Sequence, residues 1–419
     1  MRYRGGRAFR GIAAVAAGGL LLVGCSSGGG EEGDGARPEG EESASASSET
    51  TMARLWETEM DGDVTVSGLS AWSPDDGPLV FVSDEELVGI DPETGAEEWS
   101  LQAPGGEFCE RSFEVNDDGV GAVMYRSGSE CLTLAAVDAY SGEMLWESEL
   151  EGSYSGEGLD PGGRHELVIM GEGVVSVAFT SRTVRVDVGS GEQLPALETP
   201  WGPECYEVYW RHADVHTLAF GDCSEGEPEI AAFDTGSGER LWVEASDLAH
   251  NPVHSGTVLP GPDLAVADDG MVYLFDGTGE ATNQIPYAPT GLFGPVVSDS
   301  TLVFQNAQGI SAFDLRSGES LWGEAVDPVS RTHLLSEDGP ARPGPTFHRG
   351  APLRSQADIV DGGFARHLTW WDPRTGEITR EESYVGDSPD WDGGTVVHDG
   401  AFYQRSLRHE RLVAYQLSD

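Results

Sequence analysis

Two pairs of histidines have the separation that metal ligands use on a helix. They are His212 with His216, and His250 with His254. Their surroundings predict strand or loop, and residues four apart on a strand share a face but lie about 13 Å apart, too far for one ion. We therefore interpret these residues as surface histidines with satisfied hydrogen bonds, and predict no metal site.

Three acidic clusters could suggest calcium, but none has the ligand spacing of a calcium loop. They are Asp75-Asp76-Gly77, Asn116-Asp117-Asp118-Gly119 and Asp268-Asp269-Gly270. Asx-Gly sequences of this kind are typical of turns between strands. No serine-histidine-aspartate elbow, phosphate-binding glycine loop or paired-carboxylate motif stands out, so no catalytic residue is predicted.

Aspartate and serine or threonine recur in one short unit, Asp-x-x-Ser/Thr-Gly, which is usually followed by Glu and often ends in Trp eight residues after Asp. A nucleophile is needed once, whereas this unit is repeated along the chain, so we interpret its residues as structural. Asp and Ser or Thr can bond the backbone of a tight turn, Gly allows positive φ, and Trp can pack on a neighbouring repeat. The complete copies contain Asp91, Gly95 and Trp99; Asp138, Gly142 and Trp146; Asp234, Gly238 and Trp242; and Asp314, Gly318 and Trp322.

Three less complete copies begin at Asp187, Asp276 and Asp372, and successive Asp residues are 47, 49, 47, 42, 38 and 58 positions apart. This period is typical of the four-stranded blades of a β-propeller. The copy at Asp276 is one residue short. We predict an all-β propeller of eight four-stranded blades; seven blades is the alternative if the Asp276 copy is not a blade.

The two ends of the chain predict how the ring closes. Residues Leu412 to Gln416 resemble the strand before a turn, but the chain ends at Asp419 without the Gly and Trp. The missing part is at the start, where Leu55-Trp56-Glu57 matches Leu145-Trp146-Glu147 of the second repeat. We expect the strand with Trp56 to complete the last blade.

The segment before the repeats predicts export and lipid anchoring. Residues 1–24 combine four Arg with a short apolar run, as in a signal peptide. Leu22-Val23-Gly24-Cys25 resembles a bacterial lipobox, so Cys25 is the expected site of lipidation. Residues 25–52, rich in Gly, Ser and Glu, are predicted to be a disordered tether to the propeller at 53–419. We expect the protein on the outer face of the cytoplasmic membrane.

The charge of the chain excludes some partners. The formal net charge is −49, and all 24 basic residues are Arg. Such a surface repels nucleic acid and anionic membrane, so we expect membrane contact through the lipid anchor only. We also expect the protein to be a monomer.

The repeated Asp-x-x-Ser/Thr-Gly-Glu-x-x-x-Trp unit resembles the quinoprotein (pyrroloquinoline quinone, PQQ) propeller repeat, over nearly all of residues 54–419. One branch of that superfamily contains dehydrogenases with an adjacent pair of cysteines and a calcium site, and this sequence has no adjacent cysteines. The other branch contains non-catalytic lipoproteins, similar to the lipoprotein subunit of the outer-membrane barrel-assembly machinery. The absence of Lys is more typical of actinobacteria than of Gram-negative bacteria, so the barrel-assembly role is not transferred.

Four cysteines besides Cys25 fit an exported protein with disulfides. Cys109 and Cys205 each precede the Asp of their repeat by 29 residues, while Cys131 and Cys223 precede the same Asp residues by 7 and 11. We predict the pairs Cys109–Cys131 and Cys205–Cys223, each within one blade, although sequence allows three pairings.

The 58-residue interval before Asp372 is the longest and contains several prolines. We predict an extended loop on one rim, either a plain solvated insertion or a contact for a partner or ligand. It is locally basic through Arg331, Arg342, Arg349 and Arg354.

These observations predict a binding or scaffolding lipoprotein, with an extracytoplasmic sensor as a variant, and no enzyme. Its ligand would be a protein or small molecule on a propeller rim, and no cofactor is expected. The alternative is a quinoprotein dehydrogenase that binds PQQ and calcium in the central funnel.

Overall fold

The computed structural model of the chain divides into residues 1–48 and residues 49–419, and every described residue belongs to the second unit. The described ranges are 52–59, 71–74, 76–83, 85–112, 114–128, 130–150, 166–170, 173–178, 183–201, 205–212, 215–223, 228–245, 257–259, 261, 263–268, 270–287, 295–306, 309–325, 331–336, 348–349, 352–360, 363–386, 395–398, 400–406 and 411–417. The predicted signal peptide, Cys25 and nearly all of the tether lie outside these residues.

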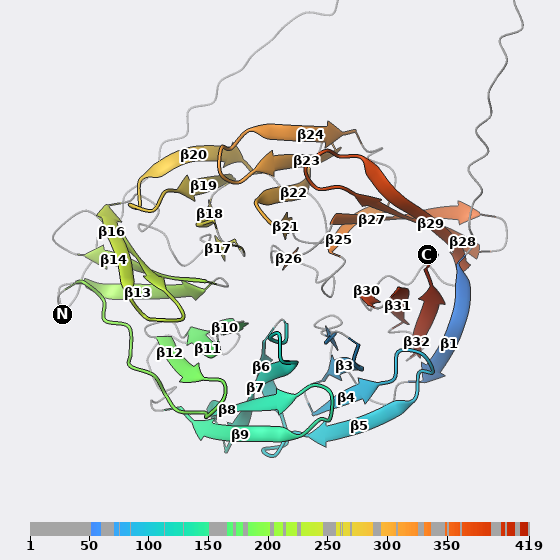
Figure 1. Ribbon diagram of the computed structural model, residues 1–419, viewed down its shortest axis with the longest axis horizontal. Helices are drawn as coiled ribbons and strands as arrows, with labels where there is room; N and C mark the ends of the chain where they lie inside the picture. Colours follow the sequence, from blue (N-terminus) through green and yellow to red (C-terminus); the bar gives the residue numbers. More distant parts are fainter. Residues whose placement is uncertain are drawn as a thin grey trace, which may run out of the picture. The chain divides into compact units, whose positions relative to one another are not determined.

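The described residues of the second unit form strands and turns, with no helix among them. Figure 1 shows the strands as eight sheets around a ring, in sequence order, with strands such as β21 and β30 near the centre and β5, β9, β20 and β24 on the outside.

The first four sheets in chain order after the amino-terminal strand are as follows. They contain β2 (Ala71–Trp72), β3 (Leu79–Val82), β4 (Glu86–Ile90) and β5 (Glu97–Gln102); β6 (Phe108–Arg111), β7 (Val120–Ser127), β8 (Glu130–Asp138) and β9 (Met144–Glu149); β10 (Glu166–Met170), β11 (Val174–Ala178) and β12 (Thr183–Asp187); and β13 (Cys205–His212), β14 (His216–Cys223), β15 (Glu229–Asp234) and β16 (Arg240–Ala245).

The other four sheets complete the ring. They contain β17 (Thr257–Val258), β18 (Ala265–Asp268), β19 (Met271–Phe275) and β20 (Ala281–Pro286); β21 (Val296–Ser298), β22 (Thr301–Asn306), β23 (Gly309–Asp314), β24 (Ser320–Glu324) and β26 (His348–Arg349); β25 (Arg331–Ser336), β27 (Pro352–Val360), β28 (Gly363–Trp371) and β29 (Ile378–Gly386); and β30 (Thr395–His398), β31 (Ala401–Ser406), β32 (Arg411–Gln416) and β1 (Ala53–Glu59).

Apolar residues of neighbouring sheets form the core, so a middle strand is covered on both faces. All five residues of β11, Val-Val-Ser-Val-Ala, are buried, and four of them are apolar, as expected of a strand between two layers. The outer strand β9, Met-Leu-Trp-Glu-Ser-Glu, instead alternates between half-buried and exposed residues. Between the first and last sheets, Leu79 and Phe81 pack with Tyr403 and Leu412.

The amino-terminal strand closes the ring, as the ends of the chain predict. β1 pairs antiparallel with β32, and Trp56 lies opposite Ala414. The Met52 amide also donates to the Ser383 carbonyl of the preceding sheet at 3.0 Å. The order of the last sheet is therefore β1-β32-β31-β30, so strands from both ends of the chain share one blade.

Among the described strands, the prediction of four strands in every blade is wrong for two of the eight sheets. The sheet β10-β11-β12 has three strands: after the turn at Asp187 only the isolated bridge Val186–Gln193 forms, and Pro195 has no amide to continue the ladder. The sheet that contains β21 has five strands, because β26 pairs with it in parallel.

Candidate functional site

The repeated Asp residues cap their own turns. At the turn between β28 and β29, Asp372 Oδ1 accepts hydrogen bonds from the amides of Arg374 and Thr375, at 3.0 and 2.7 Å, and from the Thr375 hydroxyl. The Thr375 amide and hydroxyl hold the pKa of Asp372 below its usual range. Gly376 follows with φ 71°. These carboxylates are thus occupied by turn amides, which is a structural role and not that of a general base.

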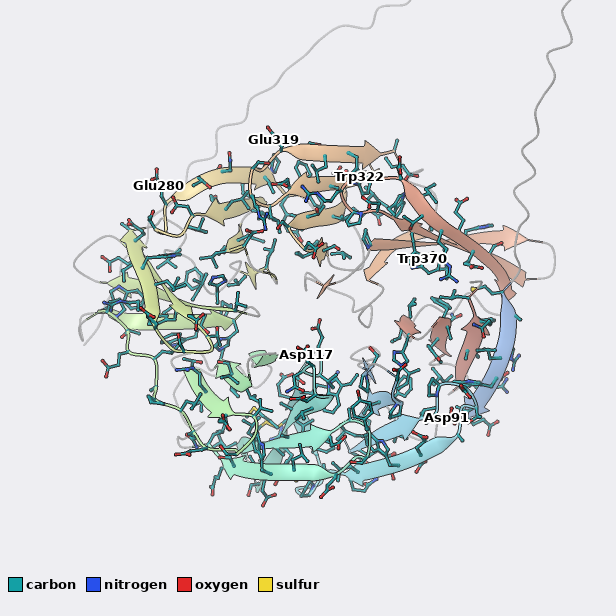
Figure 2. The ribbon with its side chains drawn as sticks, in the orientation of Figure 1. Asp91, Asp117, Glu280, Glu319, Trp322 and Trp370 are labelled. Carbon is teal, nitrogen blue, oxygen red and sulfur yellow. A yellow bond between two sulfur atoms is a disulfide. The ribbon has the colours of Figure 1, made fainter. Side chains whose placement is uncertain are left out.

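Tryptophans of the repeats lie over turn glycines of the next sheet in the ring. A Cβ built on Gly376 would be 2.7 Å from Cδ2 of Trp322, and the indole N–H of Trp322 donates to the Pro373 carbonyl at 2.8 Å. Figure 2 shows Trp322 on its outer strand at this position. The same arrangement of Trp over Gly is found for Trp56 and Gly95, Trp99 and Gly142, Trp146 and Gly191, and Trp242 and Gly279.

Two interfaces between sheets use other residues in place of Trp. Beside Gly238, the position over the glycine is taken by the Arg185 guanidinium, which donates to the carbonyls of Thr235 and Gly236 at 2.8 and 2.6 Å. Beside Gly318, the position is taken by Asn283. Arg185 lies two residues before Asp187, outside the repeat unit, so the repeats give no signal for this role.

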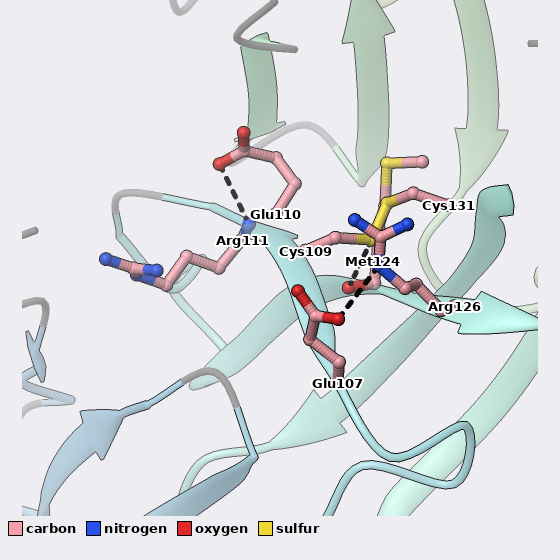
Figure 3. Close-up of a disulfide and its surroundings, with 7 residues drawn as sticks. All are labelled: Glu107, Cys109, Glu110, Arg111, Met124, Arg126 and Cys131. Atoms are coloured by element: carbon pink, nitrogen blue, oxygen red, sulfur yellow. Dashed lines mark hydrogen bonds and ion pairs between the residues drawn. A yellow bond between two sulfur atoms is a disulfide. The ribbon is translucent and has the colours of Figure 1, made fainter. Parts of the chain in front are cut away.

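The cysteines of the β6–β9 sheet form the expected disulfide. Cys109 of β6 and Cys131 of β8 are bonded, and Sγ of Cys109 lies 3.5 Å from the Met124 carbonyl oxygen between them (Figure 3). Glu107 and Arg126 form an ion pair beside the bridge, with 2.9 Å between Oε2 and Nε. The backbones of Cys205 and Cys223 are paired directly opposite each other in β13 and β14, so their disulfide stays a prediction that this register favours.

The basic insertion differs from the predicted extended loop. Arg331 begins β25, Arg354 lies in β27 and Arg349 ends β26, while Arg342 lies outside the described residues. β26 pairs in parallel with β21, the inner strand of the neighbouring sheet, through Val296–His348 and Val297–Arg349. The free backbone edge of β21 accounts for this strand, which Figure 1 places near the middle of the ring.

The acidic cluster at Asn116 lies at a turn, as predicted, and Asp75 and Asp269 of the other two clusters lie outside the described residues. Asn116 Oδ1 accepts from the amides of Asp118 and Val120 at 3.1 and 2.9 Å, and Asp117 lies on the side of its sheet toward the middle of the ring (Figure 2). Among the residues that the structure describes, no group of three His, Cys, Asp or Glu side chains could hold a metal ion. No helix of the described residues is long and apolar enough to cross a membrane.

His212 corrects the sequence interpretation, because it is buried and not a surface residue. It ends β13, while His216 begins β14 on the other side of a hairpin, so the two do not lie on one strand. The His212 ring bonds Thr217 Oγ1 at 2.8 Å and Thr183 Oγ1 at 3.1 Å, and Ser176 Oγ at 3.3 Å. His250 and His254 lie outside the described residues.

The sequence does not predict the polar cluster around His212, because its members come from four strands and a turn. Ser176 and Thr183 belong to β11 and β12, Thr217 to β14, and Thr235 follows β15. Serine and threonine alternate with apolar residues in these strands, a pattern that does not distinguish buried from exposed polar positions. Only the hairpin and the contact between two sheets bring them together.

Sheets in a ring, a first strand that completes the last sheet, and Trp packed on the next turn define a β-propeller. The family model described as "Outer membrane protein assembly factor BamB" matches residues 40–215 and 226–417. The chain belongs to this family, and the resemblance to the quinoprotein-type propellers of the barrel-assembly branch is confirmed.

One solved structure with a TM-score above 0.5 shows the same fold at low sequence identity, and two others are similar at lower TM-scores. The C-terminal WD40 domain of Sif2 is 12% identical over 88% of this chain and 99% of that chain, with a TM-score of 0.51. BamB from Moraxella catarrhalis is 18% identical over 88% and 100%, with a TM-score of 0.48. The WD40 domain of SCAP from fission yeast is 10% identical over 87% and 98%, with a TM-score of 0.48. No curated protein sequence matches the chain.

Proposed function

We propose that the chain is an exported, monomeric lipoprotein, anchored through Cys25 at the outer face of the cytoplasmic membrane, whose propeller binds a partner on one rim and acts as a scaffold or sensor. The propeller has eight blades, with the three-stranded and five-stranded sheets as the two irregular ones. The observation that carries the proposal is the family match over 40–215 and 226–417, which spans both halves of the ring.

The two faces of the ring carry different turns and connections between strands. In each antiparallel sheet, the turn between the first and second strands and the turn between the third and fourth lie at one end of the strands. In the β6–β9 sheet these turns are joined by a bond from the Ala139 amide to the Gly119 carbonyl at 2.9 Å. The other face carries the turns between second and third strands and the connections between sheets.

The basic insertion connects β25 to β27, the first and second strands of their sheet, so it leaves the sheet on the face of the Asp turns. On a body with a net charge of −49, this insertion contains Arg342 and Arg349, and Arg354 is the third residue of β27 near the same end, whereas Arg331 begins β25 at the other end. We therefore place the partner contact on the face of the Asp turns.

A photo-cross-linking amino acid at three exposed positions of the full-length, membrane-anchored protein tests this. Tyr140 represents the face of the Asp turns, Glu85 the opposite face, and Leu241 the outer wall. Tyr140 and Leu241 are matched, with exposures of 43% and 45%. The proposal expects one defined protein adduct from Tyr140 and none from Leu241; equal capture from all three positions, or no adduct from Tyr140, contradicts it.

A cofactor assay completes the test, because the same fold also hosts quinoprotein dehydrogenases. Purified protein is mixed with PQQ and calcium and examined for cofactor absorbance and for dye reduction with alcohols and sugars. We expect neither signal. Stoichiometric PQQ absorbance with dye reduction would overturn the scaffold function in favour of the dehydrogenase.

A further inference from the structure

The interface between the β10–β12 sheet and the β13–β16 sheet is unusually polar. The described part of the chain has twelve buried polar or charged side chains, and half of them lie at this interface. They are Ser176, Thr183, Arg185, His212, Thr217 and Thr235. At five other interfaces, Trp over Gly makes an apolar contact in the same place, so this interface depends on hydrogen bonds more than those five do.

The hydrogen bonds form a circuit that crosses the interface twice. His212 of β13 bonds Thr183 of β12, at 3.1 Å between Nε2 and Oγ1. On its other side His212 bonds Thr217, whose hydroxyl lies 2.8 Å from the hydroxyl of Thr235. The Thr235 carbonyl then accepts from Arg185 Nε at 2.8 Å, which returns the circuit to β12.

The circuit suits an uncharged imidazole. A neutral ring has one donor and one acceptor nitrogen, and hydroxyl partners can match either. The charged or titratable groups around it are Arg211 on the same strand, Arg185 and Asp234 on the facing elements, and His216 across the hairpin. Asp234 already accepts from the amide and hydroxyl of Ser237, so it does not offset a charge on His212.

Burial is the main cause that lowers the pKa of His212 to about 3, and Arg211 adds to it. A histidine released from the interface would regain a pKa of about 6.5. The closed interface therefore has its full stability above about pH 6.5, and loses stability as the pH falls from there toward 3, because the open state binds the proton.

We propose that the interface between the β10–β12 and β13–β16 sheets is a pH-responsive joint of the ring. When the surroundings become acidic, a proton bound to His212 breaks the circuit with Thr183 and Thr217, and the two sheets separate there while the other interfaces stay closed. This inference concerns a conformational device and is independent of the scaffold function.

Hydrogen exchange of the full mature chain at pH 7 and pH 5, corrected for intrinsic exchange rates, measures the opening of the joint. Linkage with pKa values of about 3 and 6.5 predicts an opening constant about 25-fold larger at pH 5. We expect this increase in β11, β12 and β13, and no comparable change in β22 and β23, at whose interfaces no buried histidine is found among the residues whose burial is described.

Two variants separate protonation from general loosening. His212→Gln keeps a donor and an acceptor but cannot be protonated near pH 5, so its exchange in β11 to β13 should be the same at both pH values. Thr217→Val removes the two hydrogen bonds to His212 and Thr235 but keeps the imidazole, so it should raise exchange at both pH values and retain the 25-fold ratio. In wild-type protein alone, equal protection of the joint at pH 5 and 7, or equal loosening of β22 and β23, overturns the proposal.

Discussion

Trp56 lies directly over Gly95, although the two residues belong to different sheets. A Cβ built on Gly95 would be 2.6 Å from Cε3 of Trp56, and the indole N–H donates to the Pro92 carbonyl at 2.8 Å. Trp56 is on β1, which completes the last sheet, and Gly95 is in a turn of the first sheet. This contact therefore joins the two ends of the ring.

Substitution of Gly95 by Ala should destabilise the ring. The added Cβ meets the Trp56 ring, and φ is 72° at this position, a conformation that disfavours L side chains. We expect a loss of about 1–3 kcal/mol in the free energy of unfolding, measured by urea denaturation.

Gly277→Ala is the control for both effects, because Gly277 also lies in a repeat turn but has no positive φ, and a Cβ there meets nothing within 4 Å. Its effect should be small. If Gly95→Ala and Gly277→Ala unfold at the same urea concentration, the close packing of Trp56 on Gly95 is not a source of stability.

The sequence predicts the contacts that recur in each repeat. It does not predict the contacts that stand in place of a repeat residue. Asp91, Gly95 and Trp56 could be assigned because each role recurs at a fixed spacing with one physical reason. The role of Arg185 could not be predicted, because its guanidinium takes the place of Trp but comes from a different position in the repeat. The carbonyls that it contacts belong to the facing sheet and are known only from the structure. The interpretation of His212 as a surface residue is wrong because a hairpin separates it from His216, and residue spacing alone does not show a hairpin.

A disulfide between Cys205 and Cys223 is expected from their opposed backbones in β13 and β14. Mass spectrometry of the alkylated, unreduced protein should find this pair and the Cys109–Cys131 pair. Reduction should lower the melting temperature, since each bridge contributes about 2–4 kcal/mol. A peptide that links Cys109 to Cys205 or to Cys223 would show that the assignment is wrong.

Acid should weaken the Asp turns in a defined pH range. The pKa of Asp372 is lowered in the folded protein, so its contribution to stability is present above about pH 4 and is lost as the pH falls through the folded value. Asp372→Asn should therefore unfold at lower urea than wild type at pH 7, with a smaller difference at pH 3. An equal difference at both pH values would show that the carboxylate charge is not involved.

Cys25→Ala should release the protein from the membrane, because the expected acyl chains are its anchor. Detergent-phase partitioning of cells that express either form measures this. Retention of the Cys25→Ala protein in the detergent phase would mean that another segment holds it.

The central claim is that the strand after the tether closes the ring, and two deletions test it most directly. Removal of Met52 to Met60 takes away β1 and Trp56, which exposes the edge of β32 and the buried apolar cluster on which the indole packs. Removal of Ser26 to Thr50 shortens only the predicted tether. Thermal melting with light scattering on both proteins should show a lower melting temperature and aggregation for the first deletion, and wild-type behaviour for the second. If both deletions melt at the same temperature and stay monomeric, the closure through β1 is wrong.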